Sequence, residues 1–296
     1  MPAIVLKSIK SAKILFWVQD IWPESLSATG AVKFPLFLKL TKQLTRFIYH
    51  QCDLILVQSR AFIPSVQSFG VGVSRIIYFP NSAEEFYQPV KLDDDAEEYR
   101  AMPRGFIVMF AGNIGAAQDF KTIISAAEIL KDYHDIYWVI IGEGRMRSWV
   151  EEAVKTRNLD RTFLLFKRQS PERMPAYFSL ANALLVTLCK SEIFKLTIPS
   201  KLQPYLACAR PVIAALEGEG ARIIEESRSG FSCRSEDPDA LAKLVLKMYH
   251  TGEKERQAMG SNAKQYFEKN FEQKMLLNQL DRIMNDLKRR EAECVS

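Results

Sequence analysis

Hydrophobic residues in this chain form short runs, and the runs are most regular between residues 105 and 235. Six runs in that stretch are rich in β-branched and aromatic residues, as buried strands are. A segment with apolar positions at helical spacing follows each run. Strands that alternate with helices predict a parallel sheet covered on both faces, with doubly wound topology. The predicted strands are 106–111, 137–142, 162–166, 183–188, 211–214 and 230–234.

The first 85 residues contain only three strand signals, at 14–19, 53–58 and 75–79. A free-standing doubly wound domain usually has about five or six strands, so we expect this N-terminal domain to be incomplete. The segment 86–104 has prolines near both ends and an acidic cluster between them, which is typical of a linker. The sequence therefore predicts a partial domain over 1–85, a linker over 86–104, a second α/β domain over 105–270 and a C-terminal helix over 271–296 that returns toward the first domain.

Composition places the chain among globular proteins, with 48% hydrophobic and 25% charged residues. No apolar run approaches the roughly 20 residues that span a bilayer. The five cysteines are scattered without a CxxC pair, and none of the three histidines has another candidate metal ligand nearby. We therefore expect no disulfide framework, no metal, no cofactor and a cytoplasmic location.

The net charge of +5 is modest and does not indicate a nucleic-acid partner. Residues 33–48 form a basic amphipathic helix in which Lys39, Lys42 and Arg46 accompany several leucines and phenylalanines. Two interpretations stay open. The helix is a surface helix with a solvated charged face, or it contacts anionic lipids as part of a peripheral membrane protein at the inner face of the cell membrane.

Three loops follow predicted strands of the second domain, at the edge where parallel sheets bind ligands. Gly112 and Gly115 allow the backbone to approach a bound group, although a plain tight turn explains them equally well. Gly142 and Gly144 fit an ordinary turn better. In the third loop Ser200 is a predicted helix N-cap and Lys201 adds a cation beside it, which together predict a diphosphate site. The alternative is a capped helix with an exposed lysine.

The motif order GNIG, VIIGEGRMRSWVEEAV, ANALLVTL, PSKLQPYLACARPVIAAL and DPDALAKLV resembles retaining glycosyltransferase family 4. The resemblance covers residues 105–290 and implies the GT-B fold, in which two Rossmann-like domains face a cleft. WVQDIWPESLSATG, DLILVQSRAF and IIYFPNSAEEFYQP resemble bacterial transferases similar to the L-fucosamine transferase, which build O-antigen and colanic acid. By this resemblance roughly a hundred residues of the first domain are absent, in line with the shortage of strands.

The chain departs from the family pattern at two places. The paired glutamates of the family fall near Thr197 and Pro204, neither of which can accept hydrogen bonds from ribose hydroxyls as a carboxylate does. The arginine and lysine after the first glycine loop map to Asn113 and Gln118, so Lys201 becomes the main cation. The resulting donor-binding prediction comprises Gly112, Asn113, Gly115, Gln118, Gly142, Gly144, Lys167, Arg168, Pro199, Ser200, Lys201 and Leu202.

The resemblance implies transfer of a sugar, with retention, from a UDP- or GDP-sugar to a lipid-linked or saccharide acceptor. Lys201 and Asp20 are the predicted catalytic residues, Lys201 because it can stabilise the leaving diphosphate. Asp20, Glu24 and Ser59 are the predicted acceptor-side residues, with turn capping as the alternative for Asp20. A catalytically inactive nucleotide-sugar-binding fragment and a GT-B epimerase remain as rival functions. A nicotinamide dehydrogenase is disfavoured because GNIGAAQ lacks the GxGxxG pattern.

Overall fold

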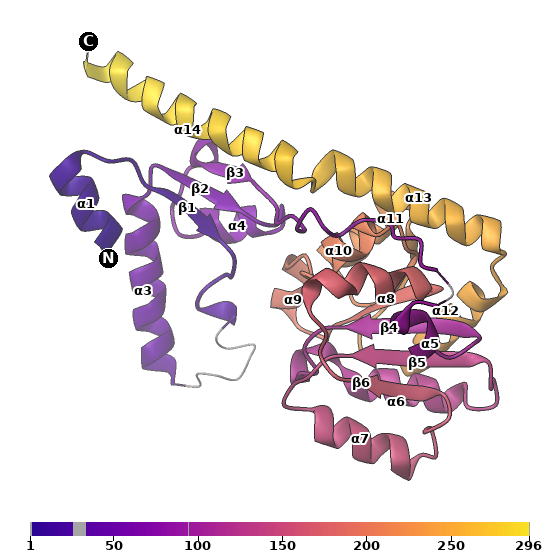
Figure 1. Cartoon of the computed structure of the whole chain (residues 1–296). Coiled ribbons are helices and arrows are strands. Elements are labelled where there is room, and N and C mark those ends of the chain that lie inside the picture. The colour runs from indigo at the N-terminus through magenta and orange to yellow at the C-terminus, as the bar shows by residue number, and fades with distance from the viewer. Residues whose placement is uncertain (1, 26–33, 94, 296) are drawn as a thin grey trace. The chain divides into compact units, whose positions relative to one another are not determined.

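The computed structural model describes residues 2–25, 34–93 and 95–295 (Figure 1). The chain divides into two compact units. Unit 1 comprises Met1–Asn81, Ser191–Ile198 and Glu272–Ser296, and unit 2 comprises Ser82–Lys190 and Pro199–Phe271. The division differs from the predicted domains in that residues 191–198 belong to unit 1, whereas residues 82–85, the predicted linker 86–104 and Phe271 belong to unit 2.

The six predicted strands of the second domain are present in unit 2. They form one sheet of order β6-β5-β4-β7-β8-β9 in which every pair is parallel. Continuous apolar sequences such as IYWVII in β5 suit a sheet that is buried on both faces. The first strand of this unit, β4, lies at the centre of the sheet. The next strands, β5 and β6, are added on one side of it and β7, β8 and β9 on the other, as in doubly wound domains. The strands are β4 Phe106–Ala111, β5 Ile136–Ile141, β6 Phe163–Phe166, β7 Ala183–Thr187, β8 Val212–Ala215 and β9 Gly230–Cys233.

Helices cover both faces of this sheet (Figure 1). One apolar cluster joins α6, α7 and α12 to the strands through side chains such as Ile124, Val150 and Val245. Asp237 caps α12, since its carboxylate accepts a hydrogen bond from the Ala240 N–H at 2.9 Å. The helices of unit 2 are α5 Glu97–Ala101, η2 Ala116–Gln118, α6 Phe120–Ile129, α7 Arg147–Thr156, η3 Pro171–Arg173, α8 Met174–Leu180, α10 Leu202–Ala207, α11 Glu219–Ser227, α12 Pro238–His250 and α13 Glu253–Asn270.

Unit 1 contains the three predicted N-terminal strands, which pair in parallel in the order β1-β2-β3. Helices α3, α4 and α9 pack on the sheet through a cluster that includes Tyr49, Phe62 and Ile193. Leu276 of α14 packs with Leu56 and Phe79 in a second cluster. The elements are α1 Pro2–Lys10, β1 Leu15–Val18, α3 Pro35–Gln51, β2 Leu54–Val57, α4 Phe62–Gln67, η1 Val73–Arg75, β3 Ile76–Tyr78, α9 Glu192–Leu196 and α14 Gln273–Val295.

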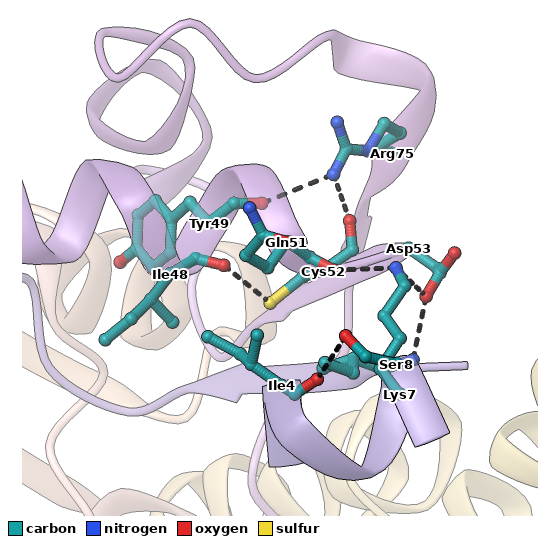
Figure 2. Close-up of polar contacts among 10 residues, drawn as sticks. Ile4, Lys7, Ser8, Ile48, Tyr49, Gln51, Cys52, Asp53 and Arg75 are labelled. Carbon is teal, nitrogen blue, oxygen red and sulfur yellow. Dashed lines mark hydrogen bonds and ion pairs between the residues drawn. The ribbon is translucent and has the colours of Figure 1, made fainter. Parts of the chain in front are cut away.

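Two cations hold the C-terminal end of α3, as Figure 2 shows. The Lys7 Nζ donates to the Gln51 carbonyl and to the Asp53 carboxylate, both at 2.8 Å, and Arg75 donates to the carbonyls of Tyr49 and Cys52. Burial opposes ionisation of Asp53, but the bonds from Lys7 and the Ile14 amide hold its pKa below the usual value. Cations at this end suit the negative pole of the helix.

Truncation of a side chain at the centre of the unit 2 sheet should destabilise that unit strongly. Ile140 of β5 is fully buried, whereas Ile129 at the end of α6 is 47% exposed. We expect Ile140→Ala to lower the free energy of unfolding by about 2 to 5 kcal/mol, because it leaves a cavity in the core. Ile129→Ala is the control and should change it by less than about 1 kcal/mol. Urea unfolding followed by tryptophan fluorescence measures both, and equal losses would contradict this description of the core.

Candidate functional site

Unit 2 has a cavity of about 350 Å³ at the carboxyl ends of β4 and β5. This is the edge of a doubly wound sheet at which ligands bind. The residues that line the cavity come from the loops after β4, β5 and β6, from α8, from the start of α10 and from the segment before α5. They are Tyr87, Ala111, Gly112, Asn113, Ile141, Gly142, Glu143, Arg168, Gln169, Pro171, Met174, Phe178, Ser200, Lys201, Pro204 and Tyr205.

The loops after β4 and β5 continue the pairing of their strands. The Gly112 N–H donates to the Ile141 carbonyl at 2.9 Å, and the Ile114 N–H donates to the Glu143 carbonyl at 2.8 Å. A Cβ on Gly142 would lie 1.9 Å from the Gly112 carbonyl oxygen, and one on Gly144 would lie 2.3 Å from the Ile114 oxygen. These two glycines are therefore needed where one loop backbone presses against the other.

Gly112 makes room for Lys201. Its φ of +142° is one that other residues rarely adopt, and a Cβ there would lie 2.6 Å from the Cε of Lys201. The lysine side chain consequently runs along the backbone of the first glycine loop. The structure thus places next to each other two predicted site residues that are far apart in the sequence.

The Lys201 ammonium group is held by neutral partners. Its Nζ donates to the Oε1 of Gln118 at 2.6 Å and lies 4.9 Å from the centre of the Phe110 ring. Burial lowers the pKa of this lysine from 10.5 to about 8. A charge in this position loses hydration and gains no counter-ion among the groups that shift its pKa. An anionic ligand in the cavity would supply the missing counter-charge.

The prediction that Ser200 caps the helix is wrong. Helix α10 begins at Leu202, its N-cap residue is Lys201, and no side chain caps it. The Leu202 N–H donates instead to the Pro199 carbonyl at 2.9 Å, so a turn occupies the position that the helix was expected to fill. Because α10 has only six residues, the Lys201 ammonium is a stronger anion-binding feature here than the helix end.

An aromatic wall completes the cavity and was not predicted from the sequence. The rings of Tyr87 and Phe178 stack with centroids 6.2 Å apart, and those of Phe178 and Tyr205 meet edge to face at 5.1 Å. The Tyr205 hydroxyl accepts from the Ala111 N–H at 2.9 Å. Pro204 lines the cavity beside these rings. This wall offers stacking surface for a planar group such as a nucleobase.

The structure brings some of the predicted donor-binding residues to the cavity and leaves others outside its lining. Gly112, Asn113, Gly142, Arg168, Ser200 and Lys201 line it. Gln118 reaches it through Lys201. Within the described residues, the following are outside the lining: Gly115, Gly144, Lys167, Pro199 and Leu202. Pro199 and Leu202 are buried, and Lys167 is exposed.

The predicted acceptor-side residues lie in unit 1. Asp20 follows β1 and lines a cavity of about 280 Å³ together with Trp17, Trp22 and Tyr49. Glu24 is exposed. Ser59 is fully buried, and its hydroxyl accepts a hydrogen bond from the Ala61 N–H at 3.2 Å, which stabilises the turn after β2.

A doubly wound sheet with a cation-bearing cavity at its carboxyl edge is an arrangement typical of α/β domains that bind nucleotides. A family model described as "Glycosyl transferases group 1" matches residues 93–266, and the chain belongs to this family. The resemblance to glycosyltransferases found in the sequence is thereby confirmed at the level of this group.

Relatives and solved structures agree with this assignment. The probable glycosyltransferase WbjE of Pseudomonas aeruginosa is 28% identical over 79% of this chain and 59% of its own length. The putative colanic acid biosynthesis glycosyl transferase WcaI of Escherichia coli is 24% identical over 96% of this chain and 70% of its own length. The chain thus spans well under the full length of both.

HepE from Anabaena, solved in complex with UDP and glucose, has a TM-score of 0.76 at 13% identity. This match covers 96% of the present chain and 74% of HepE. A glycosyltransferase from Rickettsia africae has a TM-score of 0.75 at 14% identity, over 97% of this chain and 79% of its own. These similarities confirm the GT-B fold.

The free energy of unfolding should depend on pH in a way that reveals the free-energy cost of desolvating the Lys201 charge. Between about pH 8, where folded Lys201 titrates, and about pH 10.5, where an unfolded lysine does, the unfolded chain binds more protons. The contribution of Lys201 to wild-type stability should therefore rise with pH through this window, against the opposite trend of buried thiols such as Cys208, whose pKa is raised. Lys201→Met lacks the titrating group, so it should be more stable than wild type by roughly 1 to 3 kcal/mol at pH 7, with the difference vanishing above about pH 10.5.

Urea unfolding at intervals between pH 7 and pH 10.5 measures this difference. Lys243→Met is the control, because Lys243 is exposed on α12. A Lys201→Met difference that does not change with pH would show that the lysine is not buried as a charge.

Proposed function

We propose that the chain is a glycosyltransferase that moves a sugar, with retention, from a UDP- or GDP-sugar to a lipid-linked or saccharide acceptor. Such an acceptor belongs to the synthesis of bacterial surface polysaccharide. The observation that carries the proposal is the Lys201 ammonium, fixed at the carboxyl edge of the unit 2 sheet by Gln118 and without a counter-ion in the described part of the chain. The relative WcaI, described as a putative colanic acid biosynthesis glycosyl transferase, supports the polysaccharide context.

The donor is proposed to lie along the cavity. Its diphosphate faces Lys201, the Gly112 backbone and Ser200, with Asn113 at the same end. Its nucleoside lies against Tyr87 and the aromatic wall, where Arg168 and Gln169 supply polar contacts to the base. The cavity is large enough for part of a nucleotide, since ligand sites are typically about 300 to 1,000 Å³. HepE, of the same fold, was solved with UDP.

The chemistry requires stabilisation of a leaving nucleoside diphosphate. Negative charge grows on the diphosphate as the glycosidic bond breaks, and a preorganised cation lowers the barrier more than one that must first be desolvated. Lys201 is proposed to have this role without a metal ion. Asp20 of unit 1 is proposed to orient the acceptor or to stabilise positive charge at the anomeric carbon, with Glu24 nearby in the chain. The indoles of Trp17 and Trp22 offer apolar faces to a sugar ring beside Asp20.

A polyprenyl-diphosphate-linked acceptor would stay in the membrane, so the enzyme would have to work at the membrane surface. None of the helices in the described parts of the chain combines the length and hydropathy needed to cross a bilayer. Helix α3 is proposed instead to lie on the membrane surface and to contact anionic lipids. It carries Lys39, Lys42 and Arg46 and has no acidic residue, and side chains such as Leu36 and Leu40 are exposed by 60% or more.

Donor binding and turnover should respond differently to changes at the two proposed catalytic residues. We expect Lys201→Met to weaken UDP or GDP binding by about 10- to 100-fold, because it removes a charge-assisted contact to the diphosphate. Asp20→Asn should leave that affinity within about 2-fold and reduce sugar transfer by about 100-fold or more.

Isothermal titration calorimetry measures the affinities, and release of nucleoside diphosphate from UDP- and GDP-sugars in the presence of a lipid-linked saccharide measures transfer. Lys243→Met is again the control. Donor binding without any turnover by wild type would favour the inactive binding protein. Absence of UDP and GDP binding would refute the donor site.

Membrane contact through α3 should depend on its cations. Replacement of Lys39, Lys42 and Arg46 by glutamine should reduce binding to vesicles rich in phosphatidylglycerol by on the order of 100-fold, since each cation near an anionic surface contributes about 1 kcal/mol. The matched control replaces Lys131, Lys155 and Lys243, which are exposed on unit 2. Vesicle sedimentation measures both. If the α3 variant sediments with vesicles as wild type does, the helix is only a solvated surface helix.

A further inference from the structure

Gln118 is fixed in the structure at three points. Its N–H donates to the Gly115 carbonyl at 3.0 Å, and its own carbonyl accepts from the hydroxyl of Thr187, which is fully buried at the end of β7. Its side-chain Oε1 accepts from Lys201 at 2.6 Å. The glutamine therefore connects the loop after β4 and the end of β7 with the Lys201 ammonium just before α10.

The surroundings of Lys201 are built from uncharged groups. The Phe110 ring and the Gly112 backbone flank its side chain, and Gln118 accepts its hydrogen bond. The other charged side chains that line the cavity, among the described residues, are Glu143 and Arg168. Glu143 forms an ion pair with Arg147 at 3.3 Å. Burial is the cause of the lowered pKa of Lys201, with no carboxylate to offset it.

An amide and a carboxylate at position 118 would have opposite effects on a bound anion. Either can accept the hydrogen bond that orients the ammonium. A carboxylate would also neutralise the cation and repel a diphosphate. The neutral amide orients the lysine without neutralising it, so the positive charge remains available to an anionic ligand.

We propose that Gln118 is a positioning residue that holds the Lys201 ammonium toward the cavity and leaves its charge uncompensated for a nucleoside diphosphate. The proposal rests on the proposed function in that it identifies the ligand of Lys201. It changes the predicted role of Gln118 from a direct contact of the donor to a residue that acts through the lysine.

Two variants of Gln118 separate orientation from charge. In Gln118→Met the ammonium loses its acceptor, so we expect UDP affinity at pH 7 to fall by about 10-fold and the titration of Lys201 to move to lower pH. In Gln118→Glu the ammonium keeps an acceptor and gains a counter-ion. We expect the titration of Lys201 to move above pH 9, and UDP affinity at pH 7 to fall at least as much as in Gln118→Met. Gln257→Met on the exposed face of α13 is the matched control.

The pH dependence of affinity distinguishes this role from a merely structural one. Wild-type affinity should decline above about pH 8, as Lys201 loses its proton in the free protein. The decline should begin at lower pH in Gln118→Met. In Gln118→Glu the affinity should be weak but nearly constant up to about pH 9. A residue that only stabilised the loop would lower the affinity without moving these profiles.

The experiment has two measurements. Calorimetry of the full chain with UDP, GDP and inorganic pyrophosphate between pH 6.5 and pH 9.5 gives the affinity profiles. Nuclear magnetic resonance of ¹³C-labelled lysine, with the Lys201 signal assigned by its loss in Lys201→Met, gives the titration of the lysine without any ligand. Circular dichroism confirms that each variant is folded.

Lys201 titrations that shift in opposite directions in the two variants, with weaker binding in both, would support the proposal. Unchanged titration and unchanged affinity in Gln118→Met would overturn it, as would tighter binding in Gln118→Glu. If wild type binds none of the three ligands while the titrations shift as expected, the donor site fails and the positioning of Lys201 by Gln118 stands. If wild type binds and the titrations do not shift, the positioning role alone fails.

Discussion

A partly buried cation with no counter-ion among the described residues is the constraint around which the ligand site of this chain is organised. Removing an ammonium group from water costs free energy unless other groups replace its hydration. Here the replacements are an amide oxygen and an aromatic face, which orient the Lys201 charge without cancelling it. The site therefore carries an uncompensated positive charge before any ligand binds, and a diphosphate can neutralise it.

The surrounding fold makes this arrangement possible. The loops after β4 and β5 remain in contact beyond their strands, and this contact needs glycine at 142 and 144 because a side chain would strike the neighbouring backbone. The absence of a side chain at Gly112 then opens the path of Lys201. The Tyr205 hydroxyl binds the backbone of Ala111 at the end of β4 and fixes α10 beside the strand. Catalysis by electrostatic stabilisation depends on this kind of rigidity, because the charge need not reorganise during the reaction.

Much of the fold could be predicted from local sequence. The central strands of unit 2, such as FIVMFA in β4 and IYWVII in β5, are continuous apolar runs, which suit a sheet buried on both faces. Helix α1 was not predicted, because its nine residues carry no capping signal and its anchor is a tertiary contact between Lys7 and Asp53. Residues 191–198 fall in unit 1, outside the range of the domain predicted for them, because Ile193 packs into a core whose other buried members lie more than a hundred residues earlier.

The site was predictable to a different extent. Lys201 was identified from its position in a loop after a strand, a feature that the neighbouring residues in the sequence reveal. Its partner Gln118 is 83 residues away, and nothing in either segment shows that the two side chains meet. Tyr87 joins the cavity through stacking on Phe178, a contact that no periodic pattern encodes. Ser200 has the chemistry of an N-cap, but the turn at Pro199 moves the start of the helix past it.

Proton uptake on nucleotide binding tests the central claim most directly. Calorimetric titration of wild type with UDP and GDP at pH 8.5, in buffers of different ionisation enthalpy, gives the number of protons taken up per ligand bound. If Lys201 titrates near pH 8 in the free chain and is fully protonated against a bound diphosphate, about three-quarters of a proton is taken up, and none in Lys201→Met. Binding without proton uptake by wild type, or uptake that persists in Lys201→Met, would contradict the account.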